Sequence, residues 1–328
     1  MARILTFIEA ITEALNQEMA RDERVIIFGE DIGASGGVFK ATAGLQQKYG
    51  DERVLDTPLA EGIIISTAIG SGMVGLRPVA EIQFTDFITP AMDQLIQQAA
   101  KIHYRSAGTH SCPMTVRIAC GGGVGGGLYH SQENAAWFVH EPGLKVVMPS
   151  TPYDAKGMLI SAIRDSGPVL FFEHKKLYRS VRGEVPEGEY TVPIGPAAIR
   201  REGRDMTILT YGSMTQVSLG AAEAMAKRGV EAEVIDLRTL NPLDKETILA
   251  SVRKTSKCMI VHEDKRTMGI GAELAAIVAE EAFDDLDGPI VRVTGPDIPA
   301  MPFSPPLEKF FLVNTDKVTA AMGELAAY

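Results

Sequence analysis

A histidine that closely follows a run of glycines is the clearest candidate for chemistry in this sequence. His130 comes just after residues 121–127, of which six of seven are glycine. Glycines fill no core and lose much backbone entropy on folding, so such a run marks a close backbone approach to a ligand or a loop that must move. An imidazole carried there can reach a substrate and exchange protons near neutral pH. A glycine-rich connection with a solvated or capping histidine is the alternative that spacing alone leaves open.

A carboxylate at the start of an apolar segment is the second candidate. Glu61 begins the stretch 61–76, which is rich in glycine and aliphatic residues and has the length of a buried helix. This acid is either stabilised by the dipole at a helix N-terminus or held as a buried acid that keeps a proton for a ligand. Because the residues after it are apolar or small, we expect desolvation to raise its pKa.

Other motifs are weaker. Gln83 and Phe87 lie at the end of an expected strand, 78–84, where they could line one edge of a cleft, although such a phenylalanine is often core. The sequence has no dinucleotide fingerprint, P-loop lysine, GxSxG elbow or HExxH motif. The three cysteines show no zinc spacing, so we expect buried, reduced thiols and an inert Cys120 beside the glycine run.

Composition limits the possible partners. The chain has 328 residues, 45% hydrophobic and 23% charged, which suits a globular protein of about two domains. A net charge of −10 argues against nucleic acid and favours a basic protein partner. The N-terminus lacks an export leader, and no apolar stretch approaches the roughly 20 residues of a membrane span. We therefore expect a cytoplasmic protein that does not enter a membrane.

Alternating strands and helices must position these candidates. After an opening helix with a Thr6–Glu9 capping box, strands are expected at 24–28, 78–84, 114–119, 144–148 and 169–173, with helices at 61–76, from Thr89 and Pro90 onward, and at 152–164. Beyond a region rich in proline and glycine, strands at 206–210, 232–237, 258–262 and 290–294 alternate with helices at 213–228, 244–254 and 269–283. This order predicts two α/β domains, each a largely parallel sheet flanked by helices.

Several blocks together resemble a known family. The blocks Gly29-Glu30-Asp31-Ile32-Gly33, Asp56-Thr57-Pro58-Leu59-Ala60-Glu61, Ala80-Glu81-Ile82-Gln83-Phe84, His130-Ser131-Gln132 and Leu177-Tyr178-Arg179 are similar to the β-subunit of the thiamine-diphosphate-dependent 2-oxo acid dehydrogenase first component. The resemblance extends over essentially the whole chain. It implies a transketolase-like pyrimidine-binding domain at 1–185, a linker at 186–204 and a transketolase C-terminal-like domain at 205–328.

The resemblance implies roles for individual residues. The acid matching Glu61 hydrogen-bonds a pyrimidine nitrogen of thiamine diphosphate, a task suited to a charge-assisted bond in a dry cleft. Phe87 matches the aromatic residue that packs on the aminopyrimidine, with Leu59 and Gln83 as its neighbours. His130 matches the histidine assigned to proton transfer and to reductive acylation of the lipoyl group. A structural potassium ion is also implied, with ligands at Met114, Ala162, Ile163, Asp165 and Gly167.

Half of the cofactor site is missing from this sequence. The superfamily motif of GDG followed by paired asparagines, which holds the diphosphate through a divalent metal, does not occur. The resemblance therefore implies an α-subunit that supplies magnesium and diphosphate binding, in an α2β2 heterotetramer with the cofactor at the α/β interface. It also implies docking onto the subunit-binding domain of a lipoyl acyltransferase core.

The resemblance leaves three candidate substrates: a branched-chain 2-oxo acid, pyruvate and acetoin. The blocks around His130 and Phe171-Phe172-Glu173 favour a branched-chain 2-oxo acid, whereas other blocks fit pyruvate, and acetoin dehydrogenase β-subunits share most of them. A non-catalytic subunit for assembly and docking is the alternative from a different class. A self-sufficient thiamine enzyme of the transketolase type is a third hypothesis.

Overall fold

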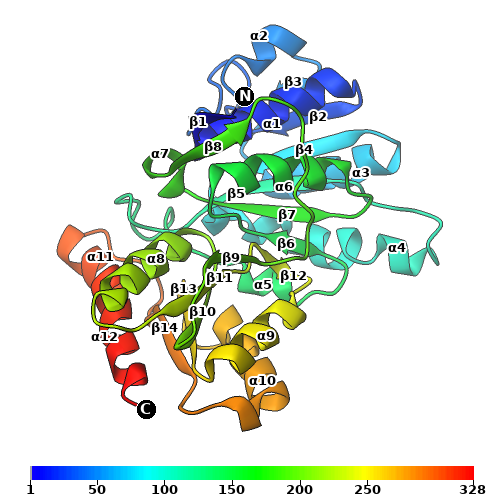
Figure 1. Cartoon of the computed structure of the whole chain (residues 1–328). Helices are drawn as coiled ribbons and strands as arrows, with labels where there is room; N and C mark the ends of the chain where they lie inside the picture. Colours follow the sequence, from blue (N-terminus) through cyan, green and yellow to red (C-terminus); the bar gives the residue numbers. More distant parts are fainter. Residues whose placement is uncertain (1) are drawn as a thin grey trace.

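The computed structural model describes residues 2–328 and forms two α/β halves (Figure 1). The N-terminal half is built on a seven-stranded sheet. Its order is β12 (Thr239–Asn241), β6 (Lys145–Val147), β7 (Val169–His174), β5 (Thr115–Cys120), β4 (Arg77–Ile82), β2 (Val25–Gly29) and β3 (Val54–Asp56). All neighbouring strands are parallel except β12, which runs antiparallel to β6.

Helices cover both faces of this sheet because its strands are apolar on both sides. Helices α1 (Phe7–Arg21) and α6 (Pro152–Arg164) pack on one face, where Ile27 and Phe171 point. Helix α3 (Glu61–Met73) packs on the other face, against residues such as Phe28. The smaller elements are β1 (Ala2–Thr6) paired with β8 (Arg182–Pro186), and α2 (Leu45–Tyr49), α4 (Ile102–Arg105), α5 (Ala136–Val139) and α7 (Leu177–Ser180).

The C-terminal half repeats this layering on five strands. Their order is β14 (Val291–Gly295), β13 (Cys258–Lys265), β10 (Met206–Thr210), β11 (Ala232–Asp236) and the antiparallel β9 (Ala198–Arg201). One face carries α8 (Ser213–Ala226) and α12 (Thr315–Ala326), and the other carries α9 (Lys245–Thr255) and α10 (Ile270–Glu281). Two short helices, η4 (Phe283–Asp285) and α11 (Pro305–Phe311), precede β14 and α12 respectively. The two-sheet α/β fold expected from the sequence is confirmed.

The two halves share one hydrophobic core. Ile64 of α3 and Leu274 of α10 belong to the same cluster of buried side chains, which continues through both sheets. The stretch expected as a linker, 186–204, contributes β9 to the second sheet, and β12 crosses back to complete the first. Both strands lie at sheet edges and are short, and their pairing is set by tertiary contacts that no local pattern announces.

Most helices begin at the residues expected from the sequence, and one expected helix does not form. The Thr6–Glu9 capping box forms at the start of α1, and Thr151 caps α6. The single helix expected from Thr89 and Pro90 is wrong. That region consists of 3₁₀ turns at Thr85–Phe87 (η1) and Thr89–Ala91 (η2), followed by a π-helical turn at Gln94–Ala99, and Thr89 makes no cap.

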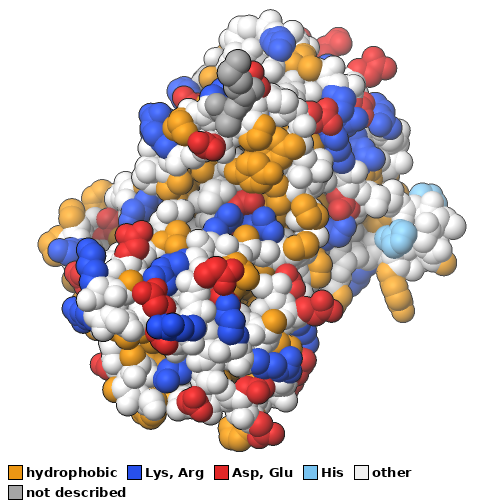
Figure 2. Space-filling view, in the orientation of Figure 1, with side chains coloured by type: hydrophobic (Ala, Val, Ile, Leu, Met, Phe, Trp, Pro, Cys, Tyr) orange, Lys and Arg blue, Asp and Glu red, His pale blue; other side chains and the backbone are white. Residues whose placement is uncertain are grey.

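Charged side chains are interspersed on the face of the molecule seen in Figure 2, where acidic and basic groups alternate over the C-terminal half. Among residues 2–328, no helix is both long enough and apolar enough to span a bilayer.

A buried ion network joins three central strands of the first sheet. The Arg117 guanidinium on β5 donates two hydrogen bonds of 2.7 Å to the Glu173 carboxylate on β7, and a third to Glu81 on β4. The Tyr178 hydroxyl also donates to Glu173, at 2.7 Å. All four side chains are buried, and burial raises the pKa of Glu81. Since each strand contributes one charged member, the network fixes the relative positions of the three strands.

Removing the central cation should destabilise the protein strongly. Replacing Arg117 by Met leaves two buried carboxylates without a countercharge, and we expect a loss of about 3–5 kcal/mol in the free energy of unfolding, measured by urea titration. The matched control is Lys245→Met, which removes an exposed pair with Glu281 at 3.2 Å and should cost under about 1 kcal/mol. Equal losses in the two variants would contradict a structural role for the network.

Candidate active site

His130 lies in an aromatic pocket next to the predicted site residues. Its ring centroid is 4.6 Å from that of Phe84 and 5.4 Å from that of Phe87, edge to face in both cases. Such contacts hold an imidazole in one orientation while leaving its nitrogens available. The structure therefore brings His130 and Phe87 together from segments more than forty residues apart, 85–87 and 128–132.

The segment after His130 is tied to the same turn. The Asp86 carboxylate accepts the backbone N–H of Gln132 at 3.4 Å, and burial raises the pKa of Asp86. Phe84, beside it, also packs against Phe39, with ring centroids 5.6 Å apart. The turn Thr85–Phe87 thus supplies both a wall for the imidazole and an anchor for the chain that carries it.

Gln83 connects this turn to an acidic group. Its amide nitrogen donates to the backbone oxygen of Glu30 at 3.1 Å. Glu30 is 4% exposed, and one of its carboxylate oxygens has no hydrogen-bond partner. Burial, followed by the negative charge of Glu61, raises the pKa of Glu30 to about 7. The negative charge of Glu61 therefore acts on Glu30, and Glu30 binds a proton more readily than an ordinary carboxylate does.

Glu61 occupies the first turn of α3, where the backbone amides of the helix favour a carboxylate. It is half-buried, and no side chain caps this helix end. Leu59, just before it, is 82% exposed, and Ile63 just after it is 68% exposed. The predicted cofactor-binding residues thus lie along an open surface.

A cavity of about 610 Å³ occurs elsewhere, between α5 and α10, and none of the predicted site residues lines it.

The glycines before His130 are required by close contacts. A Cβ on Gly121 would lie 2.0 Å from His174 Nε2, one on Gly122 would lie 2.1 Å from Met301 Sδ, and one on Gly127 would lie 2.7 Å from the Phe303 ring. At Gly125 the same space is open. The groups that approach the glycine run are His174 of the N-terminal half and Met301 and Phe303 of the C-terminal half. Approach of a ligand to this run stays a prediction.

Buried ionisable groups lie behind the loop. Lys175 is 4% exposed, its ammonium has no hydrogen-bond partner, and it lies 5.6 Å from the centre of the Phe84 ring. Burial lowers the pKa of Lys175 and raises that of the Cys120 thiol well above its usual range. Nearby, burial raises the pKa of Glu133 to about 8. A thiol held protonated in this way is a poor nucleophile, in line with an inert Cys120.

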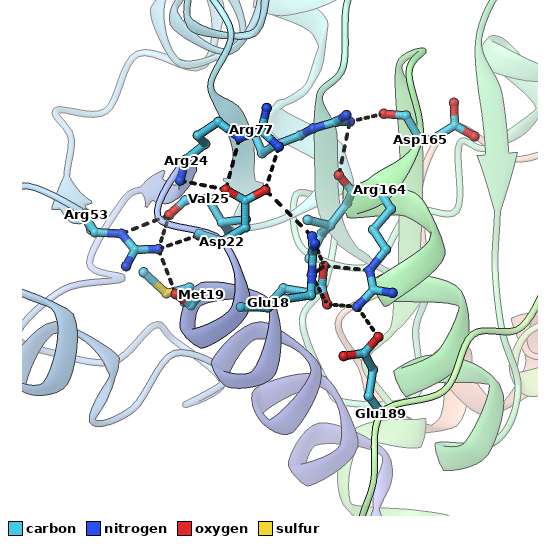
Figure 3. Close-up of polar contacts among 12 residues, drawn as sticks. Glu18, Met19, Asp22, Arg24, Val25, Arg53, Arg77, Arg164, Asp165 and Glu189 are labelled. Atoms are coloured by element: carbon cyan, nitrogen blue, oxygen red, sulfur yellow. Dashed lines mark hydrogen bonds and ion pairs between the residues drawn. The ribbon is translucent and has the colours of Figure 1, made fainter.

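The five residues predicted to hold potassium gather around the C-terminal end of α6 and the start of β5. Figure 3 shows the Arg77 side chain pointing toward Asp165 at this helix end. Arg77 donates to the backbone oxygens of Asp165 and, at 3.5 Å, of Ile163. Lys145 lies 2.5 Å from the Asp165 carboxylate. Oxygen ligands of this kind suit a hard cation, but two protein cations already face those of Ile163 and Asp165.

Several residues of this site carry no signal in the sequence. Glu30 and Phe84 stand within recognised blocks, yet nothing in their spacing identifies a proton-holding acid or a wall for His130. Their roles depend on distances across the sheet. Among residues 2–328, no group of three or more histidine, cysteine, aspartate or glutamate side chains is arranged to hold a metal ion.

Comparison with known proteins covers both halves of the chain. A family model described as the pyrimidine-binding domain of transketolase matches residues 4–181, and one described as the transketolase C-terminal domain matches residues 195–318. Among solved structures, a split-gene transketolase in an inactive β4 tetramer superposes with a TM-score of 0.81 over 98% of each chain. Its sequence identity is 22%, so this likeness concerns the fold.

Curated relatives are much more similar in sequence. The 2-oxoisovalerate dehydrogenase subunit beta of Bacillus subtilis is 56% identical over 99% of both chains. The pyruvate dehydrogenase E1 component subunit beta of the same organism is 51% identical over 92% of both. The 2-oxoisovalerate dehydrogenase subunit beta of Pseudomonas aeruginosa is 50% identical over 90% of this chain and 88% of its own length.

Proposed function

The chain belongs to the β-subunits of the first component of thiamine-diphosphate-dependent 2-oxo acid dehydrogenases, and we propose that Glu61, Gln83, Phe87 and His130 form its half of the active site. The observation that carries this proposal is the position of His130, edge-on to both Phe84 and Phe87 and anchored through Asp86. An imidazole so oriented is suited to proton transfer.

The residues present fit the cofactor. Thiamine diphosphate presents an aminopyrimidine whose nitrogens donate and accept hydrogen bonds. Glu30 offers a buried carboxylate oxygen without a partner, and Glu61 lies half-buried beside it. An unpaired buried acceptor is costly, and a donor from a ligand would remove that cost. We propose that Glu61 bonds the pyrimidine ring and that Phe87, with Leu59 and Gln83 beside it, packs along the ring.

Bound thiamine diphosphate supplies the carbon nucleophile that makes decarboxylation of a 2-oxo acid possible. The protein's part is to hold protons and exclude water. Glu61 offers a carboxylate to the pyrimidine edge, beside Glu30, whose pKa burial raises to about 7. His130, held by two phenylalanine rings, donates or accepts a proton where the acyl group is transferred to a lipoyl arm.

The open surface around Leu59 and Ile63 supports a site completed by another chain. Members of this family work with an α-subunit. We propose an α2β2 heterotetramer in which the α-subunit binds the diphosphate through magnesium, and whose docking partner is the subunit-binding domain of a lipoyl acyltransferase core. Cys112, Cys120 and Cys258 are free and buried, which suits the reducing cytoplasm.

For the domain division we propose the boundaries expected from the sequence: 1–185, a connection at 186–204 that also supplies β9 to the second sheet, and 205–328. For the substrate we propose a branched-chain 2-oxo acid such as 3-methyl-2-oxobutanoate. The support is the 56% identity to a 2-oxoisovalerate dehydrogenase subunit, against 51% to a pyruvate dehydrogenase subunit from the same organism.

The proposed roles of Glu61 and His130 predict that their variants lose different activities in the co-expressed α/β complex. Glu61→Gln keeps size but removes the acid, and we expect decarboxylation to fall at least about a hundredfold. His130→Ala should reduce lipoyl acylation by a similar factor. Both are measured by steady-state kinetics, with exposed Glu23→Gln as control. Full activity of both variants would instead favour a subunit for assembly only.

The substrate proposal predicts a rank order. Among pyruvate, 3-methyl-2-oxobutanoate and acetoin, the branched-chain acid should give the highest kcat/KM with the co-expressed complex, because one or two buried methyl groups contribute roughly 10–200-fold in a matching pocket. A higher value for pyruvate or acetoin would reassign the substrate and leave the family unchanged.

Potassium is proposed at Met114, Ala162, Ile163, Asp165 and Gly167. A backbone oxygen has two lone pairs, so those of Ile163 and Asp165 can accept from Arg77 while binding an ion. The thermal unfolding midpoint should then rise with KCl relative to choline chloride at equal ionic strength, as ligand linkage requires. A midpoint that is indifferent to potassium would mean that Arg77 and Lys145 alone satisfy these oxygens.

A further inference from the structure

The backbone amides of the glycine run bind carboxylates from the C-terminal half. The Gly122 N–H donates to Glu263 Oε1 at 2.6 Å. The Gly123 and Gly125 N–H groups both donate to Glu308 Oε1, at 3.1 and 3.2 Å. Glu263 lies on β13, and Glu308 on α11. Each acid reaches across the boundary between the halves, over more than 140 residues of sequence.

The backbone conformation of the run explains why it attracts anions. Gly121, Gly123, Gly125 and Gly127 have φ angles of 81°, 79°, 71° and 67°, so every second residue is left-handed. Backbone that alternates in this way can present successive N–H groups to anions, as phosphate-binding loops do; here the Gly123 and Gly125 amides converge on Glu308, and the Gly122 amide binds Glu263. A phosphate is the usual occupant of such a cradle, and here the occupants are two glutamates of the same chain.

Both carboxylates are built into the interior. Glu263 is 4% exposed and Glu308 is 9% exposed. Burial disfavours the charged form of Glu263, yet His174, which lies 3.2 Å away, and the Gly122 amide hold its pKa below the usual value. The neighbours of Glu308 on both sides in α11 are exposed, whereas the Glu308 side chain points into the protein.

We propose that Glu308 is a positioning residue for His130: it anchors residues 121–130 through the two glycine amides. The inference rests on the proposed role of His130 in the reaction. A loop of this composition has almost no side chains with which to pack, so hydrogen bonds from its amides must supply much of its order. A charged acceptor shared by two amides is a strong anchor of that kind.

The anchor can be measured without reference to activity. In the α/β complex, amide hydrogen exchange of peptides covering 121–131 should quicken about tenfold in Glu308→Ala and less in Glu308→Gln, which retains a neutral acceptor. Lys309→Gln, the exposed neighbour on α11, should match the wild type. If the alanine variant does not fold, the faster exchange expected of the glutamine variant, compared with the wild type, is the test. Unchanged exchange in a folded Glu308 variant would overturn the proposal.

Kinetics then test the consequence for His130. We expect Glu308→Ala to lower kcat for acyl transfer to a lipoyl domain about tenfold, with KM for the 2-oxo acid within about twofold, since the pyrimidine-facing residues stand on other elements. Faster exchange with wild-type acyl transfer, in an enzyme that His130→Ala inactivates, would overturn the positioning role. If His130→Ala is itself fully active, the proposed function fails, while exchange still reports on the anchor.

Discussion

The buried contact of Arg117 with Glu81 and Glu173 is the constraint on which the site depends. Glu81 and Glu173 stand next to the last residues of β4 and β7, and Arg117 lies in the middle of β5, close to the strand ends where loops of a parallel sheet carry function. A cation bonded to two acids with no access to water tolerates little displacement, because any separation leaves an uncompensated charge in the interior. The three strand ends therefore stay in fixed relation to each other.

Each of these strands leads directly into part of the site. Two residues after Glu81 comes Gln83, and the turn with Phe87 follows. After Arg117, β5 ends at Cys120 and the glycine run begins. After Glu173 comes His174, which contacts the glutamate that binds Gly122. One ion network thus sets the starting points of the aromatic wall, the histidine loop and the support beneath that loop.

Much of the fold was accessible from the sequence, and the reasons are local. Capping at Thr6 and Thr151 and the apolar runs of the central strands depend on neighbouring residues alone. The edge strands β9 and β12 and the irregular turns before Gln94 were missed, because tertiary contacts determine them. At the site, the glycine context identified His130, but the roles of Glu30, Phe84 and Glu308 depend on approaches between distant segments. The roles of Glu61 and His130 in catalysis stay predictions.

The crossing of β12 into the first sheet has a consequence for how the chain is made. During synthesis the N-terminal half emerges first, but the edge of β6 has no partner until residues 239–241 have left the ribosome. The glycine run has to wait longer still, for Glu308. An unpaired edge is a site for wrong association. The two halves are thus not independent folding units, and the nascent chain is exposed to mispairing until it is nearly complete.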